Sequence, residues 1–150
     1  MRERIRVVRY HDISCGHRVV GHEGKCKNLH GHNYRITFTC EGPKLDEIGR
    51  IIDFTVIKNL LCEWLERNWD HNFLFWIEDP VGIKITRTKI ILPQLGAVFV
   101  PFNPTAENMG KYLLSTIGPQ VLAGTGVTLV KILVEETRKC SAEVELVNNC

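Results

Sequence analysis

A seven-residue stretch, CKNLHGH at positions 26–32, most constrains what this chain can form. It leads directly into a run rich in β-branched and aromatic residues at positions 33–40, which predicts a β-strand. Because successive side chains of a strand alternate between its faces, His30 and His32 project to the same side. Two neutral imidazoles on one face suit Zn²⁺, which takes nitrogen ligands at about 2.0–2.1 Å, and Gly31 lets the backbone approach closely.

A catalytic zinc site needs a third protein ligand and keeps a fourth position open for water or substrate. Three upstream histidines, His11, His17 and His22, could supply that ligand. The structural alternative is a pair of surface histidines on an edge strand. Five of the six histidines fall within positions 11–32, and this local density favours the metal site.

Two roles are open for Cys26, which could bind the metal or act as a reactive group. A thiolate near zinc, flanked by Lys25 and Lys27, would be stabilised and could accept a proton near neutral pH.

The composition is that of one globular domain, which we expect to span residues 1–150. A net charge of +2, with no basic run interleaved with aromatics, argues against nucleic acid as a partner. No apolar run reaches the length of a membrane span. Local positive charge around Arg18, Lys25 and Lys27 favours an anionic substrate.

The six cysteines, at positions 15, 26, 40, 62, 140 and 150, are not preceded by a signal peptide. We therefore expect a cytoplasmic protein in which most cysteines are reduced and act as small buried apolar residues.

The first half of the chain predicts two strands, at 4–14 and 31–40, that pair antiparallel across a glycine-rich loop. This pairing would bring His17 close to His30 and His32. A helix, capped by Asp53 or Thr55, then runs to about residue 68. An acid–histidine pair, Asp70-His71, follows it and is either a solvated helix end or a proton-transfer pair.

The second half predicts a hairpin at 84–89 and a short strand at 96–100. A helix capped by Thr105, with Glu107 in its first turn, ends near Gly118-Pro119. Strands at 127–137 and 141–147 complete the order ββ, α, a mixed stretch, α, ββ. This order predicts an α+β fold with an antiparallel sheet and two helices on one face. Strand alternation places Val130 with residues 132, 134 and 136, and Leu129 on the opposite face.

These motifs, in this order, resemble the 6-pyruvoyl-tetrahydropterin synthase and 6-carboxy-tetrahydropterin synthase (QueD-like) enzymes over nearly the whole chain. His17 after the first strand, together with the motif that holds His30 and His32, is a specific pattern. Each of the other motifs is weak alone, but their occurrence in this order is strong. The matching positions are His17, C-x-x-x-H-G-H-N-Y at 26–34, I-D-F at 52–54, Asp70-His71, P-T-A-E-N at 104–108 and Glu136-Thr137.

The resemblance implies that His17, His30 and His32 hold Zn²⁺, and that Cys26 is catalytic and not a ligand. Asp70 and His71 match the family's acid–histidine pair.

The family's pterin-anchoring glutamate precedes a threonine, which selects Glu136 over Glu135. Thr105 and Glu107 line the pterin pocket or only cap their helix.

The family fold is the tunnelling fold, in which sheets join into a barrel, commonly a homohexamer made of two trimers. Active sites lie between subunits, so Asp70-His71 could serve a zinc site on a neighbouring chain.

The resemblance further implies conversion of 7,8-dihydroneopterin triphosphate without a redox cofactor. Three residues separate Cys26 from His30, as in the carboxy-tetrahydropterin branch, whereas the pyruvoyl branch typically has five. We therefore expect 6-carboxytetrahydropterin, acetaldehyde and triphosphate as products, at the entry to queuosine and other 7-deazaguanines. The alternatives are the pyruvoyl activity and a zinc-containing pterin or purine binder without turnover. The chain departs from the family pattern at Cys15-Gly16, at Phe75 and over residues 73–100.

Overall fold

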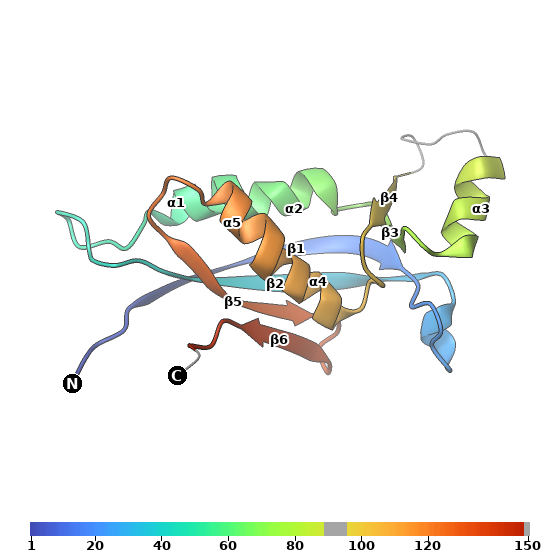
Figure 1. Cartoon of the computed structure of the whole chain (residues 1–150), viewed down its shortest axis with the longest axis horizontal. Coiled ribbons are helices and arrows are strands. Elements are labelled where there is room, and N and C mark those ends of the chain that lie inside the picture. Colours follow the sequence, from blue (N-terminus) through green and yellow to red (C-terminus); the bar gives the residue numbers. More distant parts are fainter. Residues whose placement is uncertain (89–95, 149–150) are drawn as a thin grey trace.

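Two long strands form the centre of a six-stranded sheet in the computed structural model, which describes residues 1–88 and 96–148 (Figure 1). β1 and β2 pair antiparallel along their whole length, from Arg6↔Glu41 to His17↔His30. The strands are β1 (Arg6–His17), β2 (His30–Glu41), β3 (Phe73–Trp76), β4 (Ala97–Val100), β5 (Thr128–Glu135) and β6 (Ser141–Glu145), in the spatial order β4-β3-β1-β2-β5-β6.

The four strands β1, β2, β5 and β6 pair antiparallel with one another, as the sequence predicts. β3 and β4 instead pair parallel, β3 with β1 and β4 with β3, so the whole sheet is mixed. The order ββ-α-α-ββ holds for the main elements, with β3, β4 and a third helix inserted between the two helical segments.

Both long helical segments cover the same face of the sheet (Figure 1). The first comprises α1 (Phe54–Ile57), the π-helical η2 (Lys58–Cys62) and α2 (Glu63–Asn68). Asp53 is its N-cap, since its carboxylate accepts a hydrogen bond from Thr55 N at 2.7 Å. The second comprises α4 (Ala106–Tyr112), the π-helical η4 (Leu113–Ile117) and α5 (Gly118–Val121).

Two predictions about helices were wrong. Residues 84–88 belong to α3 (Pro80–Thr88) and not to a hairpin, because Asp79 starts a helix by accepting hydrogen bonds from Val81 N and Ile83 N. Lys89, the last residue of the expected hairpin, lies outside the described residues. The second helical segment continues past Gly118-Pro119, because Pro119 stands in the first turn of α5, where its missing N–H costs little.

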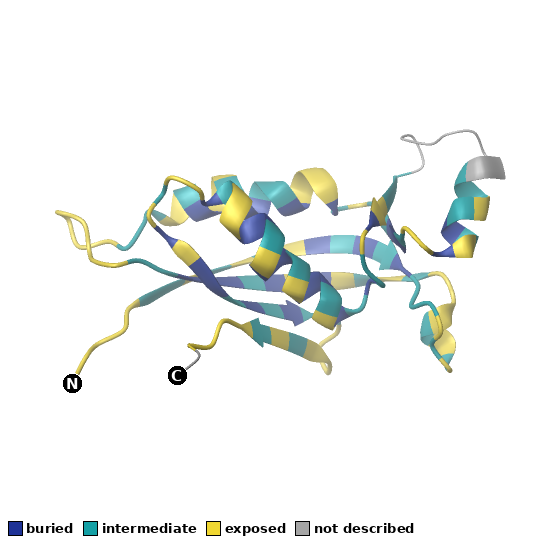
Figure 2. Ribbon diagram, viewed as in Figure 1, coloured by how far each residue is buried: buried dark blue, intermediate teal, exposed yellow. Residues whose placement is uncertain are grey.

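The core lies between the helices and the covered face of the sheet (Figure 2). β2 contributes Tyr34, Ile36 and Phe38, all fully buried. Fully burying one such side chain is worth about 1.5–3 kcal/mol. The predicted alternation in β5 fails at a β-bulge, where the pairing shifts from Thr39↔Lys131 to Cys40↔Leu129. The extra residue turns Leu129 into the core cluster, so Leu129 and Val130 are both buried.

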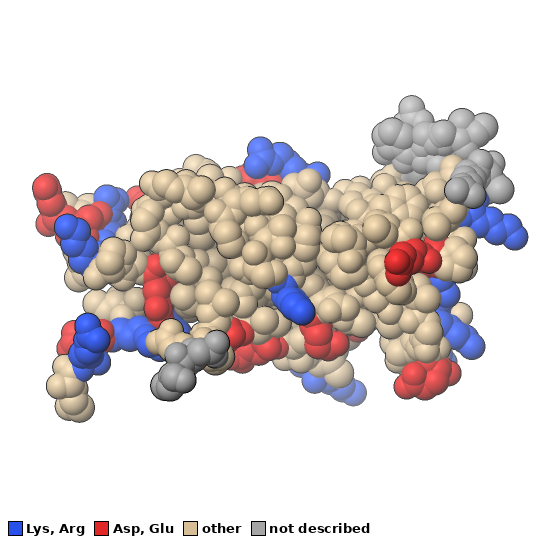
Figure 3. Space-filling model, in the orientation of Figure 1, with Lys and Arg blue, Asp and Glu red and all other residues tan. Residues whose placement is uncertain are grey.

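Charges on the face seen in Figure 3 are of both signs and scattered over the described residues. Among the described residues, no helix combines the length and apolar character that crossing a membrane requires. The thiols of Cys15, Cys26, Cys40, Cys62 and Cys140 are free, and Cys150 lies outside the described part of the chain.

Candidate metal centre and active site

Three histidines meet where β1 ends and β2 begins. The register pairs His17 with His30 and Cys15 with His32, so all three imidazoles lie on the same face of the two strands. One ring nitrogen from each histidine lies within 4.8 Å of the others, and His17 Nε2 is 3.1 Å from His30 Nε2. Two zinc–nitrogen bonds of about 2.0–2.1 Å in tetrahedral geometry place their nitrogens about 3.3 Å apart. The spacing therefore suits a small divalent cation.

Backbone carbonyls hold two of these rings through Nδ1. His17 Nδ1 is 2.6 Å from Pro104 O, and His30 Nδ1 is 2.7 Å from Asn28 O. A ring that donates from Nδ1 presents a lone pair at Nε2 when it is neutral. The two Nε2 atoms at 3.1 Å are then both acceptors, an arrangement that a cation between them would stabilise.

The third ring has an unsatisfied nitrogen. His32 Nε2 is buried and has no hydrogen-bond partner in the described part of the chain, although Glu136 Oε1 lies 3.2 Å away outside hydrogen-bond geometry. Burial lowers the pKa of His17 and of His32, which favours the neutral form that binds metals. The three imidazole nitrogens therefore fit Zn²⁺. The described residues contain no other group of three potential metal ligands.

The two other candidate ligands lie elsewhere. His11 Nε2 is 2.5 Å from Glu66 Oε1 on α2, and His22 Nδ1 accepts a hydrogen bond from Gly24 N within its own loop. Spacing along the sequence allowed either histidine to be the third metal ligand, and the structure places both away from the cluster.

Cys26 lies in the short 3-10 helix η1 (Lys25–Lys27) within the loop that joins β1 to β2. Its side chain is half-buried, and its carbonyl accepts a hydrogen bond from Val19 N at 2.8 Å. Burial raises the pKa of the Tyr34 phenol, and the nearby Cys15, Glu136 and Cys26 raise it further. Cys26 and Glu136 thus lie near the same buried phenol, whose oxygen is 3.4 Å from His17 Nε2.

Asp70 and His71 form a hydrogen-bonded pair next to β1. Asp70 Oδ2 is 2.7 Å from His71 Nδ1, and Asp70 Oδ1 accepts a hydrogen bond from Ser14 N at 2.9 Å. Burial opposes ionisation of Asp70, but the Ser14 N–H and His71 outweigh it and lower the pKa of this carboxyl. The backbone of His71, with φ of 59°, turns here and donates from its N–H to Ser14 O at 2.6 Å.

The His71 side chain faces outward and is 81% exposed. It lines a hollow with Ser14 and Asn33, which alternate to the sheet face opposite to His17 and His30, and also with His32 of the histidine cluster. Within the described part of the chain, no hydrogen bond or ion pair joins His71 to Cys26 or to the three histidines. A joint role of His71 with Cys26 and the three histidines stays a prediction.

The predicted substrate-binding residues differ in their positions. Glu136 lies beside His32, whereas Glu135 pairs with Arg35 across the strands. Thr105 caps α4, accepting a hydrogen bond from Asn108 N at 3.1 Å, and Glu107 is exposed in its first turn. A contact of Thr105 or Glu107 with substrate stays a prediction.

Sequence reasoning missed the groups that orient the site. The carbonyls of Pro104 and Asn28 carry no side-chain signal, so no pattern could have shown them. Arg18 was expected to attract an anionic substrate, but it pairs with the buried Asp79. The sequence offered no sign that these two residues, far apart in the chain, are partners.

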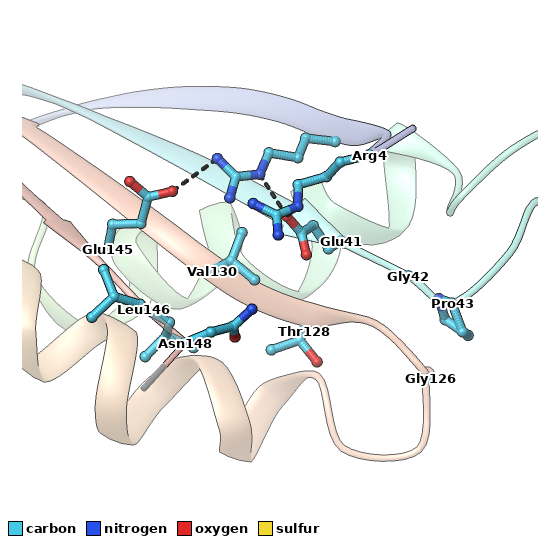
Figure 4. A pocket seen from close by; sticks show the side chains of 12 residues that line it. Arg4, Glu41, Gly42, Pro43, Gly126, Thr128, Val130, Glu145, Leu146 and Asn148 are labelled. Carbon is cyan, nitrogen blue, oxygen red and sulfur yellow. Dashed lines mark hydrogen bonds and ion pairs between the residues drawn. The ribbon is translucent and has the colours of Figure 1, made fainter. Parts of the chain in front are cut away.

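A second hollow lies at the other end of β1, away from the histidines (Figure 4). Its charges are mutually neutralised, because Arg6 contacts Glu41 at 2.6 Å and Glu145 at 2.9 Å. We therefore assign the site to the histidine end.

Comparisons with known proteins agree with this geometry. The sequence model of the family described as 6-pyruvoyl tetrahydropterin synthase matches residues 6–146. The chain belongs to this enzyme family. A family relative from Rickettsia typhi, named 6-carboxy-5,6,7,8-tetrahydropterin synthase, is 35% identical over 144 residues, which cover 93% of this chain and 99% of the relative. A relative of the same name from Aquifex aeolicus is 33% identical over 126 residues, covering 79% and 75%.

Solved structures show the same tunnelling fold. An uncharacterised protein from Wolinella succinogenes superposes with a TM-score of 0.81 at 22% identity, covering 96% of this chain and 99% of that one. The 6-pyruvoyl tetrahydropterin synthase of Plasmodium vivax superposes with a TM-score of 0.72 at 18% identity, covering 95% and 98%. The family and the α+β tunnelling fold inferred from the sequence are therefore confirmed.

Proposed function

We propose that this chain is a cytoplasmic, zinc-dependent 6-carboxy-5,6,7,8-tetrahydropterin synthase. It converts 7,8-dihydroneopterin triphosphate to 6-carboxytetrahydropterin, with release of acetaldehyde and triphosphate, in queuosine and 7-deazaguanine biosynthesis. The observation that carries the proposal is the convergence of His17, His30 and His32, two of them locked by carbonyls with Nε2 free. The name shared by the relatives from Rickettsia typhi and Aquifex aeolicus supports the carboxy product.

Each of the proposed site residues has a separate role in the reaction. Glu136 accepts hydrogen bonds from the donor edge of the pterin, from its place beside His32. Cys26 removes or delivers a proton at the substrate side chain. Bound zinc would act as a Lewis acid toward the side-chain oxygens of the substrate. His71 moves the opposing proton, and Asp70 holds its ring through the 2.7 Å contact at Nδ1.

We further propose that His71 serves the metal site of a neighbouring subunit in a homohexamer built as a dimer of trimers. Two observations support a shared site. The His71 ring is 81% exposed, and within the described residues no hydrogen bond or ion pair joins it to Cys26 or to the three histidines. The sheet face without helices would then line the inside of a barrel.

The test is a product assay on zinc-loaded protein with 7,8-dihydroneopterin triphosphate. We expect acetaldehyde to appear in step with 6-carboxytetrahydropterin, identified by mass. Cys26→Ala should lose at least about 100-fold in turnover and keep its zinc, whereas Cys140→Ala, which removes an exposed thiol, should behave as wild type.

Other outcomes would change the assignment. A pyruvoyl pterin without acetaldehyde would overturn the carboxy product and leave the pyruvoyl activity. Bound zinc and pterin without any turnover would favour a binding protein. Full activity of Cys26→Ala would remove this residue from the mechanism.

A further inference from the structure

Arg18, which directly follows His17, joins the loop that carries Cys26 to the start of α3. Its Nε donates a hydrogen bond to Lys27 O at 2.9 Å, and its Nη1 contacts Asp79 Oδ1 at 2.5 Å. Lys27 is the immediate neighbour of Cys26. One guanidinium therefore connects the end of β1, the Cys26 loop and the inserted helix.

Asp79 is completely buried, and only 15% of the Arg18 side chain is exposed. The same Asp79 Oδ1 accepts a hydrogen bond from Val81 N at 2.9 Å, while Oδ2 is buried without a hydrogen-bond partner among residues 1–88 and 96–148. A carboxylate in this position depends on the nearby guanidinium for its compensation. The position of Arg18 is thus set by a buried partner and not by solvent.

Further hydrogen bonds fix the same loop from the other side. Asn103 donates to Val20 O at 2.9 Å and accepts from Val20 N at 3.0 Å, and Val19 N donates to Cys26 O. Asn103 precedes Pro104, whose carbonyl holds His17. The loop around Cys26 and a ligand of the metal site are therefore anchored to the same segments.

We infer that Arg18 and Asp79 are a positioning pair that sets where the Cys26 thiol stands relative to the histidine cluster. A displacement of about 1 Å at a reacting group can cost about 100-fold in rate. Loss of the pair should lower kcat, whereas loss of a substrate-binding cation would raise KM. The catalytic consequence rests on the proposed function of Cys26, but the conformational effect on the loop does not.

The test compares wild type with Arg18→Lys in the zinc-loaded full-length protein. Lysine keeps a cation for Asp79 but lacks the planar fork that reaches Lys27 O at the same time. We expect kcat to fall at least about tenfold, with KM within about twofold and zinc content unchanged. Alkylation of Cys26, measured peptide by peptide, should rise relative to the exposed Cys140 of the same molecules.

Arg50→Lys is the matched control, since Arg50 also bridges two acceptors, Asp46 and Asp53, on an exposed loop. It should leave kcat and the alkylation ratio unchanged. Asp79→Asn keeps an acceptor for Arg18 without the charge, and should change kcat and alkylation in the same direction as Arg18→Lys.

Three results would overturn the inference. The first is a kcat and a Cys26 alkylation ratio in Arg18→Lys that equal those of wild type. The second is a rise in KM while kcat stays unchanged. The third is a loss of activity in proportion to the loss of bound zinc or of folded protein. If the wild-type enzyme shows no turnover, the proposed function fails. The alkylation ratios of Arg18→Lys and Asp79→Asn then still decide whether the pair holds the Cys26 loop.

Discussion

Adjacent residues can occupy different environments, as Glu135 and Glu136 do at the end of β5. Glu136 Oε1 is 3.2 Å from His32 Nε2 in the histidine cluster. Glu135 stands opposite Arg35 on β2 and lines a hollow with Asp12. The two side chains therefore lie on opposite faces of the strand, as the alternation of side chains predicts, and we assign them different roles.

We expect Glu136→Gln to weaken pterin binding by about 1.5–3 kcal/mol, because a hydrogen bond to a charged acceptor is worth about that much. Glu135→Gln is the matched control and should bind pterin as wild type does. Fluorescence titration with a non-reactive pterin, on protein of checked zinc content, measures both. Equal losses in the two variants, or a loss in Glu135→Gln alone, would contradict the assignment.

Single residues also show how much of the site can be predicted from the sequence. The pairing of His30 and His32 followed from strand alternation alone. The selection of His17 over His11 and His22 came from the predicted pairing of the first two strands and from the family resemblance, because spacing along the chain alone does not tell which distant side chain returns to the site. The carbonyls that orient the rings leave no mark in the sequence.

At the scale of elements, local patterns identified the long antiparallel strands and both capped helices. They failed over residues 73–88, where strand pairing depends on distant partners and the local helix start at Asp79 was not recognised. β3 pairs parallel with β1, and the segment after β3 becomes helical because Asp79 caps it. Phe75, which departs from the family pattern, is 4% exposed and lies against Phe73, Phe99 and the backbone of Gly82.

Gly82 lets α3 approach this aromatic cluster closely. A Cβ at this position would stand 2.7 Å from Phe75 Cγ and 2.9 Å from Phe75 Cβ. We expect Gly82→Ala to lower the free energy of unfolding by about 1–3 kcal/mol, although alanine is intrinsically the better helix former. Urea denaturation measures this change.

A double-mutant cycle supplies the control. In a Phe75→Ala background the same substitution should cost less, because alanine lacks the Cγ and Cδ1 atoms that stand closest to the added Cβ. An equal cost in both backgrounds would assign the effect to something other than Phe75.

At the scale of the whole molecule, one face of the sheet carries no helix formed by the described residues (Figure 2). Val8 and Tyr10 on this face are 52% and 53% exposed, whereas Ile13 and Cys15 on the covered face are buried. Apolar side chains on an open sheet are typical of surfaces that a partner covers. The arrangement agrees with the proposed barrel of several chains.

Subunit mixing tests whether active sites are shared. Cys26→Ala and His71→Ala should each be inactive alone. When the two are coexpressed, about one interface in four should combine an intact Cys26 with an intact His71, and turnover should return to about a quarter of wild type. Assays on the purified mixed oligomer measure this recovery.

Mixing two preparations of the same variant is the control and should restore nothing. A mixed oligomer that stays inactive would show that His71 acts within its own chain.

The two groups that orient the rings of His17 and His30 are backbone carbonyls, those of Pro104 and Asn28. A substitution at position 104 or 28 changes a side chain and leaves the carbonyl in place. The orientation of the two rings therefore depends on the path of the backbone at these positions and not on which amino acid stands there.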